Sequence, residues 1–192
     1  MQTKQFKLKK RRIFRDLAII VLSVIIAIYI QISPTISHNM IDYFSGLYFV
    51  PAAFLVGFFF SLTFTAAIST SVFITLSQTT TNPLLIAFLG GFGSVVANSI
   101  IYKFFKEELI DDIKFLEPKY AKRIANKIFH SKLFIGLIPY ISALLLVSPL
   151  PDEIGILILA GSNYRYTHFF LLSFLLHTTG ILIIVLLGKL VI

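Results

Sequence analysis

Residues 17–32 read LAIIVLSVIIAIYIQI, and this run decides the class of the protein. It is apolar apart from Ser23 until it reaches Gln31, and as a helix it covers most of a hydrocarbon core about 30 Å thick. A basic segment precedes it, as in a signal peptide. The run is at the long end for that role and no A-x-A-like site follows, so we predict an uncleaved first membrane span over 17–33.

The composition of the whole chain agrees with a membrane protein. Of 192 residues, 57% are hydrophobic and only 14% are charged, which leaves too little polar surface to coat a soluble globule. Cysteine is absent, so disulfides and thiol-ligated metals are excluded. Tryptophan is also absent, so the aromatic residues at the interfaces must be Tyr and Phe. We therefore expect an all-α integral membrane protein.

Positive charge is confined to two main segments, which predicts the orientation. Of 17 Lys and Arg residues, seven lie within residues 1–15 and eight within residues 103–132, while residues 16–102 contain none. By the positive-inside rule, the N-terminus (1–16) and the loop 106–132 are cytoplasmic. The basic N-terminus can also attract anionic lipid. A nucleic-acid partner is excluded, because the net charge of +8 is not spread over a soluble face.

The next apolar pieces are short. Residues 46–60 and 66–76 are too short for comfortable crossings, so we predict a re-entrant hairpin, with two short full spans as the alternative. Its polar tip contains Ser61, Thr63 and Thr65. Their hydroxyls suit either a tip at membrane depth, where freed backbone groups need partners, or back-bonding within ordinary helices.

A short exterior loop is expected over 34–45, and a second full span over 84–105. This span carries Gly90, Gly91 and Gly93, whose small size favours close helix packing. Asn98 in its middle either bonds to another helix or lines a cavity.

The charged segment that follows shows amphipathic-helix spacing, broken at Pro118. Its second piece presents basic residues opposite its apolar ones, as an interfacial helix would. Four acids precede Pro118 and are expected to form a solvated face: Glu107, Glu108, Asp111 and Asp112.

A second hairpin is predicted over 133–163, followed by a third span over 166–187. Asp152 and Glu153 would lie at its tip, and carboxylates at bilayer depth usually face a water-filled cavity. Asp152 also fits the N-terminus of the following helix as a cap. For Glu153 we expect proton exchange. His177 in the last span is either a partner of these acids or a core histidine satisfied by hydrogen bonds.

The two halves, 46–105 and 133–190, share one plan of hairpin then span, entered from opposite sides. The predicted fold is therefore an all-α integral membrane protein with three full transmembrane helices and two oppositely oriented re-entrant hairpins, which form an inverted repeat. Inverted repeats with broken helices are typical of transporters.

Residues 148–161 read SPLPDEIGILILAG and precede the apolar span that runs from Phe169 to Gly188. With the repeat plan, they resemble the DedA superfamily, also called the VTT or SNARE-associated Golgi protein family. They look still more like uncharacterised small membrane proteins of archaea and bacteria with similar segments around 57–60 and 148–155. The resemblance implies lipid translocation, by scrambling or by proton-coupled transport of a lipid carrier. The family pattern places an arginine in the second hairpin, and Arg165, beyond the turn, approximates it as the candidate for a lipid head group.

Our leading hypothesis is a lipid translocator with a polar groove between the hairpin tips. Its expected proton-binding residues are Asp152, Glu153 and His177, and the expected groove-lining residues are Ser61, Thr65, Asn98, Ser148, Pro149 and Pro151. Membrane lipids are the expected partners, with protons and a second copy of the chain as further candidates, and no cofactor or metal is expected.

The alternative function is a non-catalytic membrane scaffold or assembly factor that uses the amphipathic loop. An enzyme is not expected, because the sequence has no H-E-x-x-H, no phosphate loop and no triad order of Ser, His and Asp.

Overall fold

The computed structural model describes residues 2–44, 46, 48–79, 82–115, 140, 152–161 and 165–191. Within these residues the regular structure is entirely helical, as the sequence predicts, and no strand is present. The helices are α1 (Gln2–Ile32), α2 (Pro34–Phe44), α3 (Phe49–Phe60), α4 (Ala66–Leu76), α5 (Pro83–Phe115), α8 (Asp152–Gly161) and α9 (Tyr166–Val191).

Two of these helices are long and apolar enough to cross a membrane. They are α5 over Pro83–Glu107 and α9 over Tyr166–Leu190. A third span results if the bent pair of α1 (from Leu17) and α2 is counted as one. Helices α3 and α4 are apolar but shorter. The apolar helices fit a membrane-embedded protein.

Helix α2 replaces the exterior loop that we expected over 34–45. It bends from α1 by 84° after a break at Ser33. A serine followed by proline favours a helix start, since proline at the first helical position has a preset φ and needs no N–H partner. Met40 and Phe44, one turn apart, pack against the apolar core and give the short helix a buried side.

Helix α5 continues to Phe115, ten residues or so beyond the predicted span. The first part of the predicted charged loop is thus the continuation of a spanning helix. Pro118, the basic second piece of the loop and the first arm of the second hairpin (133–147, apart from Tyr140) lie outside the described residues.

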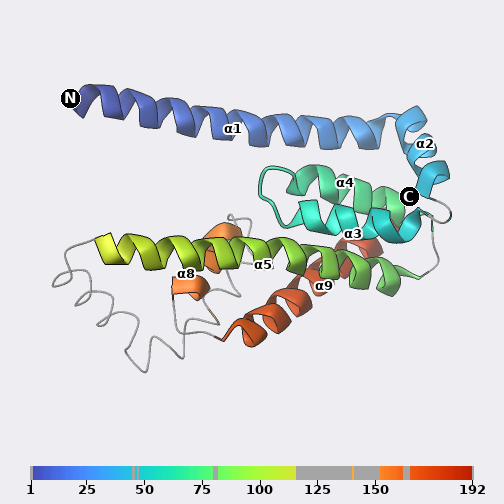
Figure 1. Ribbon diagram of the computed structural model, residues 1–192. Coiled ribbons are helices and arrows are strands. Elements are labelled where there is room, and N and C mark those ends of the chain that lie inside the picture. The colour runs from blue at the N-terminus through green and yellow to red at the C-terminus, as the bar shows by residue number, and fades with distance from the viewer. Residues whose placement is uncertain are drawn as a thin grey trace.

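The order of the helices across the molecule differs from their order in the chain (Figure 1). Helix α1 packs on α4, α4 on α3, α3 on α5, and α5 on α9, with α8 against α5. Helices α5 and α9 are antiparallel: Gly90 of α5 lies beside Ile181 of α9, whereas Tyr102, further along α5, stacks on Phe169 near the start of α9 at 4.5 Å between ring centroids. The far end of α9 reaches α4, where Gly188 lies beside Ile74.

Glycines let α3 and α5 cross at backbone distance. A Cβ added to Gly57 would lie 2.0 Å from the carbonyl oxygen of Gly90, and one added to Gly93 would lie 2.0 Å from that of Phe54. A Cβ added to Gly91 would lie 2.0 Å from the hydroxyl oxygen of Thr178 on α9. The packing role predicted for the Gly90–Gly93 segment is confirmed, and it brings α3 against the middle of the α5 span.

The buried apolar side chains form two clusters. The first joins α3, α4, α5 and α9: Phe49, Ala53, Val72, Phe73, Leu76, Ile86, Ala87, Ile181 and Val185. The second joins α5, α8 and α9: Tyr102, Ile156, Leu159, Ala160 and Phe169. Each cluster removes large side chains from contact with the surroundings and fixes the helices around it.

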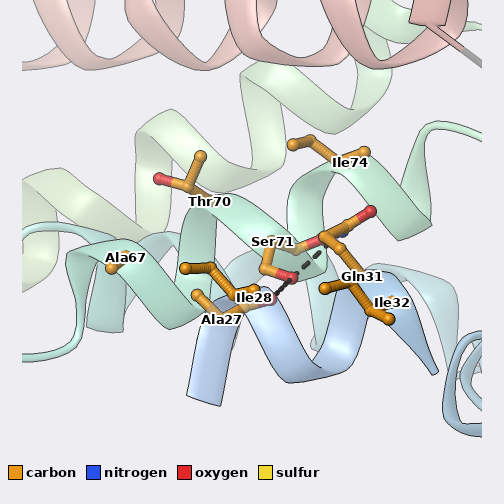
Figure 2. A pocket seen from close by; sticks show the side chains of 8 residues that line it. All are labelled: Ala27, Ile28, Gln31, Ile32, Ala67, Thr70, Ser71 and Ile74. Carbon is orange, nitrogen blue, oxygen red and sulfur yellow. Dashed lines mark hydrogen bonds between the residues drawn. The ribbon is translucent and has the colours of Figure 1, made fainter. Parts of the chain in front are cut away.

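A hollow of about 250 Å³ lies between α1 and α4. Figure 2 shows Gln31 pointing from α1 to Ser71 on α4, with apolar side chains such as Ile28 and Ile74 around them. The Gln31 amide nitrogen donates to the Ser71 carbonyl oxygen at 2.8 Å and lies 3.0 Å from its hydroxyl oxygen. The Ser71 hydroxyl donates to the carbonyl of Ala27 at 3.0 Å. These polar contacts join the first helix to the rest of the molecule.

We expect Gln31→Leu to loosen α1. The change removes the two contacts with Ser71 but keeps the side-chain volume, and single interhelical bonds in membranes contribute about 0.6 to 1.7 kcal/mol. Limited proteolysis between α1 and α2 in detergent should therefore be faster than in the wild type. Thr70→Val, on the same hollow but bonded within its own helix, is the control. Equal proteolysis rates of Gln31→Leu and wild type would contradict the prediction.

Candidate functional site

A layer of buried polar side chains separates the two apolar clusters. On α9 the buried face runs Phe169, Ser173, His177, Ile181 and Val185, at intervals of four residues. The second and third of these residues are polar, Phe169 before them belongs to one apolar cluster, and the two residues after them belong to the other. The layer is completed by Ser61, Ser94 and Asn98, each at most 1% exposed. Buried polar groups are costly unless they are bonded, so the bonds of this layer decide what it does.

Asn98 lies at the centre of the layer and is fully buried. Its amide oxygen accepts a hydrogen bond from the Ser61 hydroxyl, at the end of α3. Its amide nitrogen donates to the Ser173 hydroxyl of α9 at 2.9 Å and lies 3.5 Å from Nε2 of His177. Asn98 therefore makes the interhelical bonds that were one of its two predicted roles, and links three helices.

His177 connects the layer to the start of α8. Its Nδ1 lies 2.9 Å from the carbonyl oxygen of Ser173, and its Nε2 lies 3.0 Å from Oδ2 of Asp152. The ring is 4% exposed, and the ring of Phe60 packs edge-on against it at 6.2 Å between centroids. Two roles were predicted for His177, a histidine satisfied by hydrogen bonds and a partner of the acids. The structure agrees with both, because both ring nitrogens have partners and one partner is Asp152.

Glu153 connects α8 to the turn between α3 and α4. Its carboxylate accepts a hydrogen bond from the Thr63 hydroxyl at 2.5 Å and one from the Thr63 backbone N–H at 3.4 Å. Neighbouring acids in the first turn of α8 thus have different partners, Asp152 on α9 and Glu153 on the 61–65 turn. The 61–65 turn, the tip of the first predicted hairpin, thus contacts one of the two acids predicted at the tip of the second.

The polar layer lies near the middle of the candidate spans. Asn98 is nine residues before Glu107, about 14 Å along the helix, and His177 is eleven residues after Tyr166, about 17 Å along it. Half of a hydrocarbon core is about 15 Å. Two carboxyl groups, an imidazole and an amide therefore meet near the middle of the two candidate spans, a combination able to bind protons or other polar groups.

Other predicted site residues lie elsewhere. The Thr65 hydroxyl donates to the carbonyl of Phe59 at 2.6 Å, so it stabilises the turn and satisfies a freed backbone group. Arg165 is exposed at the start of α9, twelve residues and about 18 Å along the helix from His177, and is not brought to the polar layer. Ser148, Pro149 and Pro151 lie outside the described residues.

Ser94 and Ser173 are the residues of the polar layer that our sequence analysis missed, and Ser173 bonds directly to Asn98. Ser173 lies one helical turn before His177, so its place on the same face follows from the helix period once His177 is chosen. Over the described part of the chain, no group of three His, Asp or Glu side chains has the arrangement of a metal site. The side chains that meet in the layer can donate and accept hydrogen bonds, and its carboxyl and imidazole groups can bind protons.

Comparisons with known proteins provide no evidence on the function, which is therefore argued from the geometry of the site. No family model matches the chain, and neither does any curated protein or solved structure.

Proposed function

We propose that this protein translocates lipid across the membrane, using the polar layer around Asp152, Glu153 and His177 as the place where the head group crosses. The proposal includes the topology predicted from the sequence: three transmembrane helices, two re-entrant hairpins of opposite orientation, and the N-terminus and charged loop in the cytoplasm. Lipid scrambling and proton-coupled carrier transport are the two forms that the activity can take.

The observation that carries the proposal is the pair of acids held in the polar layer, near the middle of the candidate spans. Asp152 and Glu153 each contact a polar side chain from a different element, His177 and Thr63. Placing a carboxylate in the bilayer centre costs about 2.5 to 3.5 kcal/mol on insertion scales, so such residues usually serve transport or proton transfer. Helix packing alone would be achieved more cheaply by apolar side chains of the same size.

The lengths of α3 and α4 support the hairpin. They have 12 and 11 residues, about 18 Å and 16 Å, and neither covers a core about 30 Å thick. The 61–65 turn that joins them contacts the middle of α5 and the start of α8 through Ser61 and Thr63. A turn at that depth, with its hydroxyls bonded to protein, is what a re-entrant segment requires.

The ends of the spans support the orientation. Lys103 and Lys106, near the end of the α5 span, lie over the rings of Tyr166 and Tyr102 at 5.9 Å and 5.5 Å. Tyrosines with lysines beside them are typical of a membrane interface, and an excess of lysine and arginine marks its cytoplasmic side. The resemblance of residues 148–161 to the DedA pattern is a separate argument for lipid translocation.

Lipid passage requires the polar layer to open. The hydroxyl of Thr63 and the carboxylate of Glu153 bond to each other, as do Asp152 and His177. A head group that replaced these partners would find the same donors and acceptors, so the layer exchanges one set of hydrogen bonds for another as the lipid passes. This exchange lowers the cost of a polar group in the hydrocarbon core.

Scrambling in proteoliposomes tests the proposal. Fluorescent head groups in the outer leaflet are bleached with an impermeant reductant, and the inner pool is bleached only as it is scrambled outward. We expect Asp152→Asn/Glu153→Gln to slow scrambling at least about tenfold, equivalent to about 1.4 kcal/mol or more in the barrier. Ser99→Ala, which removes a buried hydroxyl without a partner in the described part of the chain, is the matched control.

Two other outcomes would each contradict part of the proposal. Equal rates for wild type and the double variant would remove the acids from the path. If folded wild type does not scramble, uptake of a labelled lipid carrier under an imposed proton gradient is the next measurement. Failure of both would favour the scaffold, whose function should depend on the 106–132 loop and not on Asp152 and Glu153.

A further inference from the structure

We propose that Asp152 and His177 form a one-proton switch, and that loss of the proton releases the 61–65 turn from α8. The contact between Thr63 and Glu153 is the latch that the switch controls. The use of this movement for transport rests on the proposed function. The assignment of the proton rests on the geometry of the pair alone.

The first step is the state of the His177 ring. Its Nδ1 lies 2.9 Å from the carbonyl oxygen of Ser173. A carbonyl oxygen can only accept a hydrogen bond, so Nδ1 carries a hydrogen and donates it. This bond is made within α9, one turn back, and therefore holds the ring in one tautomer whatever happens at its other nitrogen.

The second step is the proton on the far side of the ring. Nε2 of His177 lies 3.0 Å from Oδ2 of Asp152. If neither atom carried a hydrogen, two lone pairs would face each other at hydrogen-bond distance. One proton must therefore lie between them, as an imidazolium with a carboxylate or as a neutral imidazole with a carboxylic acid. Either form is neutral overall.

The third step is what surrounds the pair. Helix α5 contributes the Asn98 amide, α3 the Phe60 ring, and α9 the Ser173 hydroxyl and carbonyl, all uncharged. From α8 comes Glu153, the remaining ionisable side chain at this site among the described residues. No described lysine or arginine forms an ion pair here, so loss of the shared proton leaves a net negative charge that no cation of the described residues compensates.

The last step links charge to movement. Asp152 and Glu153 are consecutive residues in the first turn of α8, so their charges interact through space although Asp152 points to His177 and Glu153 points to Thr63. Two adjacent negative charges in a water-poor layer repel each other and gain by moving toward water. Because the Glu153 carboxylate holds the 61–65 turn through Thr63, its movement breaks the latch and separates the turn from α8.

The experiment measures this separation directly. Since the chain has no cysteine, spin labels can be placed at Phe64→Cys on the turn and Leu157→Cys on α8, positions 43% and 39% exposed. Distances are recorded by double electron–electron resonance in nanodiscs at pH about 5 and about 9, on either side of neutrality. We expect one short distance at low pH and an additional longer one at high pH.

Matched variants separate the switch from the latch. Asp152→Asn places an amide N–H toward Nε2 without charge, so the short distance should persist at both pH values. Thr63→Val removes the hydroxyl at constant volume and should give the longer distance even at low pH, whereas Thr63→Ser should restore the wild-type response. A label pair across α5 and α9, Phe92→Cys and Leu175→Cys, should not change with pH.

Three results would overturn the proposal: a wild-type distance that does not depend on pH, the same pH response in Asp152→Asn, or ¹⁵N resonance of wild-type His177 with an unprotonated Nδ1. The resonance is assigned by its loss in His177→Gln and requires no altered site in the sample that is measured. None of these readings involves lipid movement. A working switch without either scrambling or carrier transport would leave the switch standing and refute the proposed function.

Discussion

Replacing Gly93 by alanine is expected to destabilise the protein by about 3 kcal/mol or more, a large effect for a single methyl group. The added Cβ would lie 2.0 Å from the backbone carbonyl oxygen of Phe54 and 2.8 Å from the backbone nitrogen of Phe58. Backbone atoms cannot rotate away as a side chain does, so α3 and α5 must separate. Thermal unfolding in detergent, followed by circular dichroism, measures the loss.

Gly180→Ala is the control for this prediction. Gly180 is also helical, but an added Cβ there meets no heavy atom within 4 Å. Alanine is favoured over glycine in a helix by up to about 1 kcal/mol, so this variant should be as stable as wild type or more stable. Equal melting temperatures for Gly93→Ala and Gly180→Ala would show that the close crossing of α3 and α5 is absent in the membrane protein.

Asn98→Leu is expected to have the second large effect. The side chain is fully buried and bonds to Ser61 and Ser173, with His177 at 3.5 Å. Leucine fills a similar volume but leaves two buried hydroxyls without this partner. With about 0.6 to 1.7 kcal/mol for each interhelical bond, we expect a loss of roughly 2 to 3 kcal/mol. Unfolding in detergent measures this value as well.

Ser99→Ala is the natural comparison for Asn98→Leu, one residue further along the same helix. The Ser99 hydroxyl is buried and has no hydrogen-bond partner within the described part of the chain. Removing it should be neutral or slightly stabilising, because an unsatisfied buried hydroxyl costs free energy. If both variants lost the same stability, the loss would come from disturbed packing of α5 and not from the bonds of Asn98.

The apolar helices were predictable from sequence because hydrophobic length is a local property. The runs 84–105 and 166–187 lie within α5 and α9, and the pieces around 46–60 and 66–76 contain α3 and α4. Hydropathy could not distinguish α2 from a loop, because its helical state depends on Met40 and Phe44 packing against residues distant in the chain. It also could not show where α5 ends, because lysine and glutamate have high helix propensity and can extend a helix beyond its apolar part.

The sequence was sufficient to predict most of the residues that form the site, but not which of them contact each other. Buried polar residues in apolar runs pointed to Asn98, His177 and the two acids. Which acid contacts which partner depends on how α8 lies against α5 and α9, and no local pattern contains that information. Asp152 as a helix cap and Asp152 as a partner of His177 look the same in sequence. Ser173 was missed because a lone serine in an apolar run is common in membrane helices.

The short length of α3 sets where the protein becomes polar. From Phe49 to Phe60 the helix advances about 18 Å, and the glycine crossing fixes its position along α5, so the turn at Ser61 meets Asn98. One inserted residue in α3 would rotate the turn by about 100° and shift it by about 1.5 Å, so Ser61 would leave the polar layer. Seven inserted residues would restore the face but place the turn about 10 Å beyond Asn98. The number of residues in α3 therefore determines where the 61–65 turn lies, so the length of this helix is as necessary to the site as its side chains.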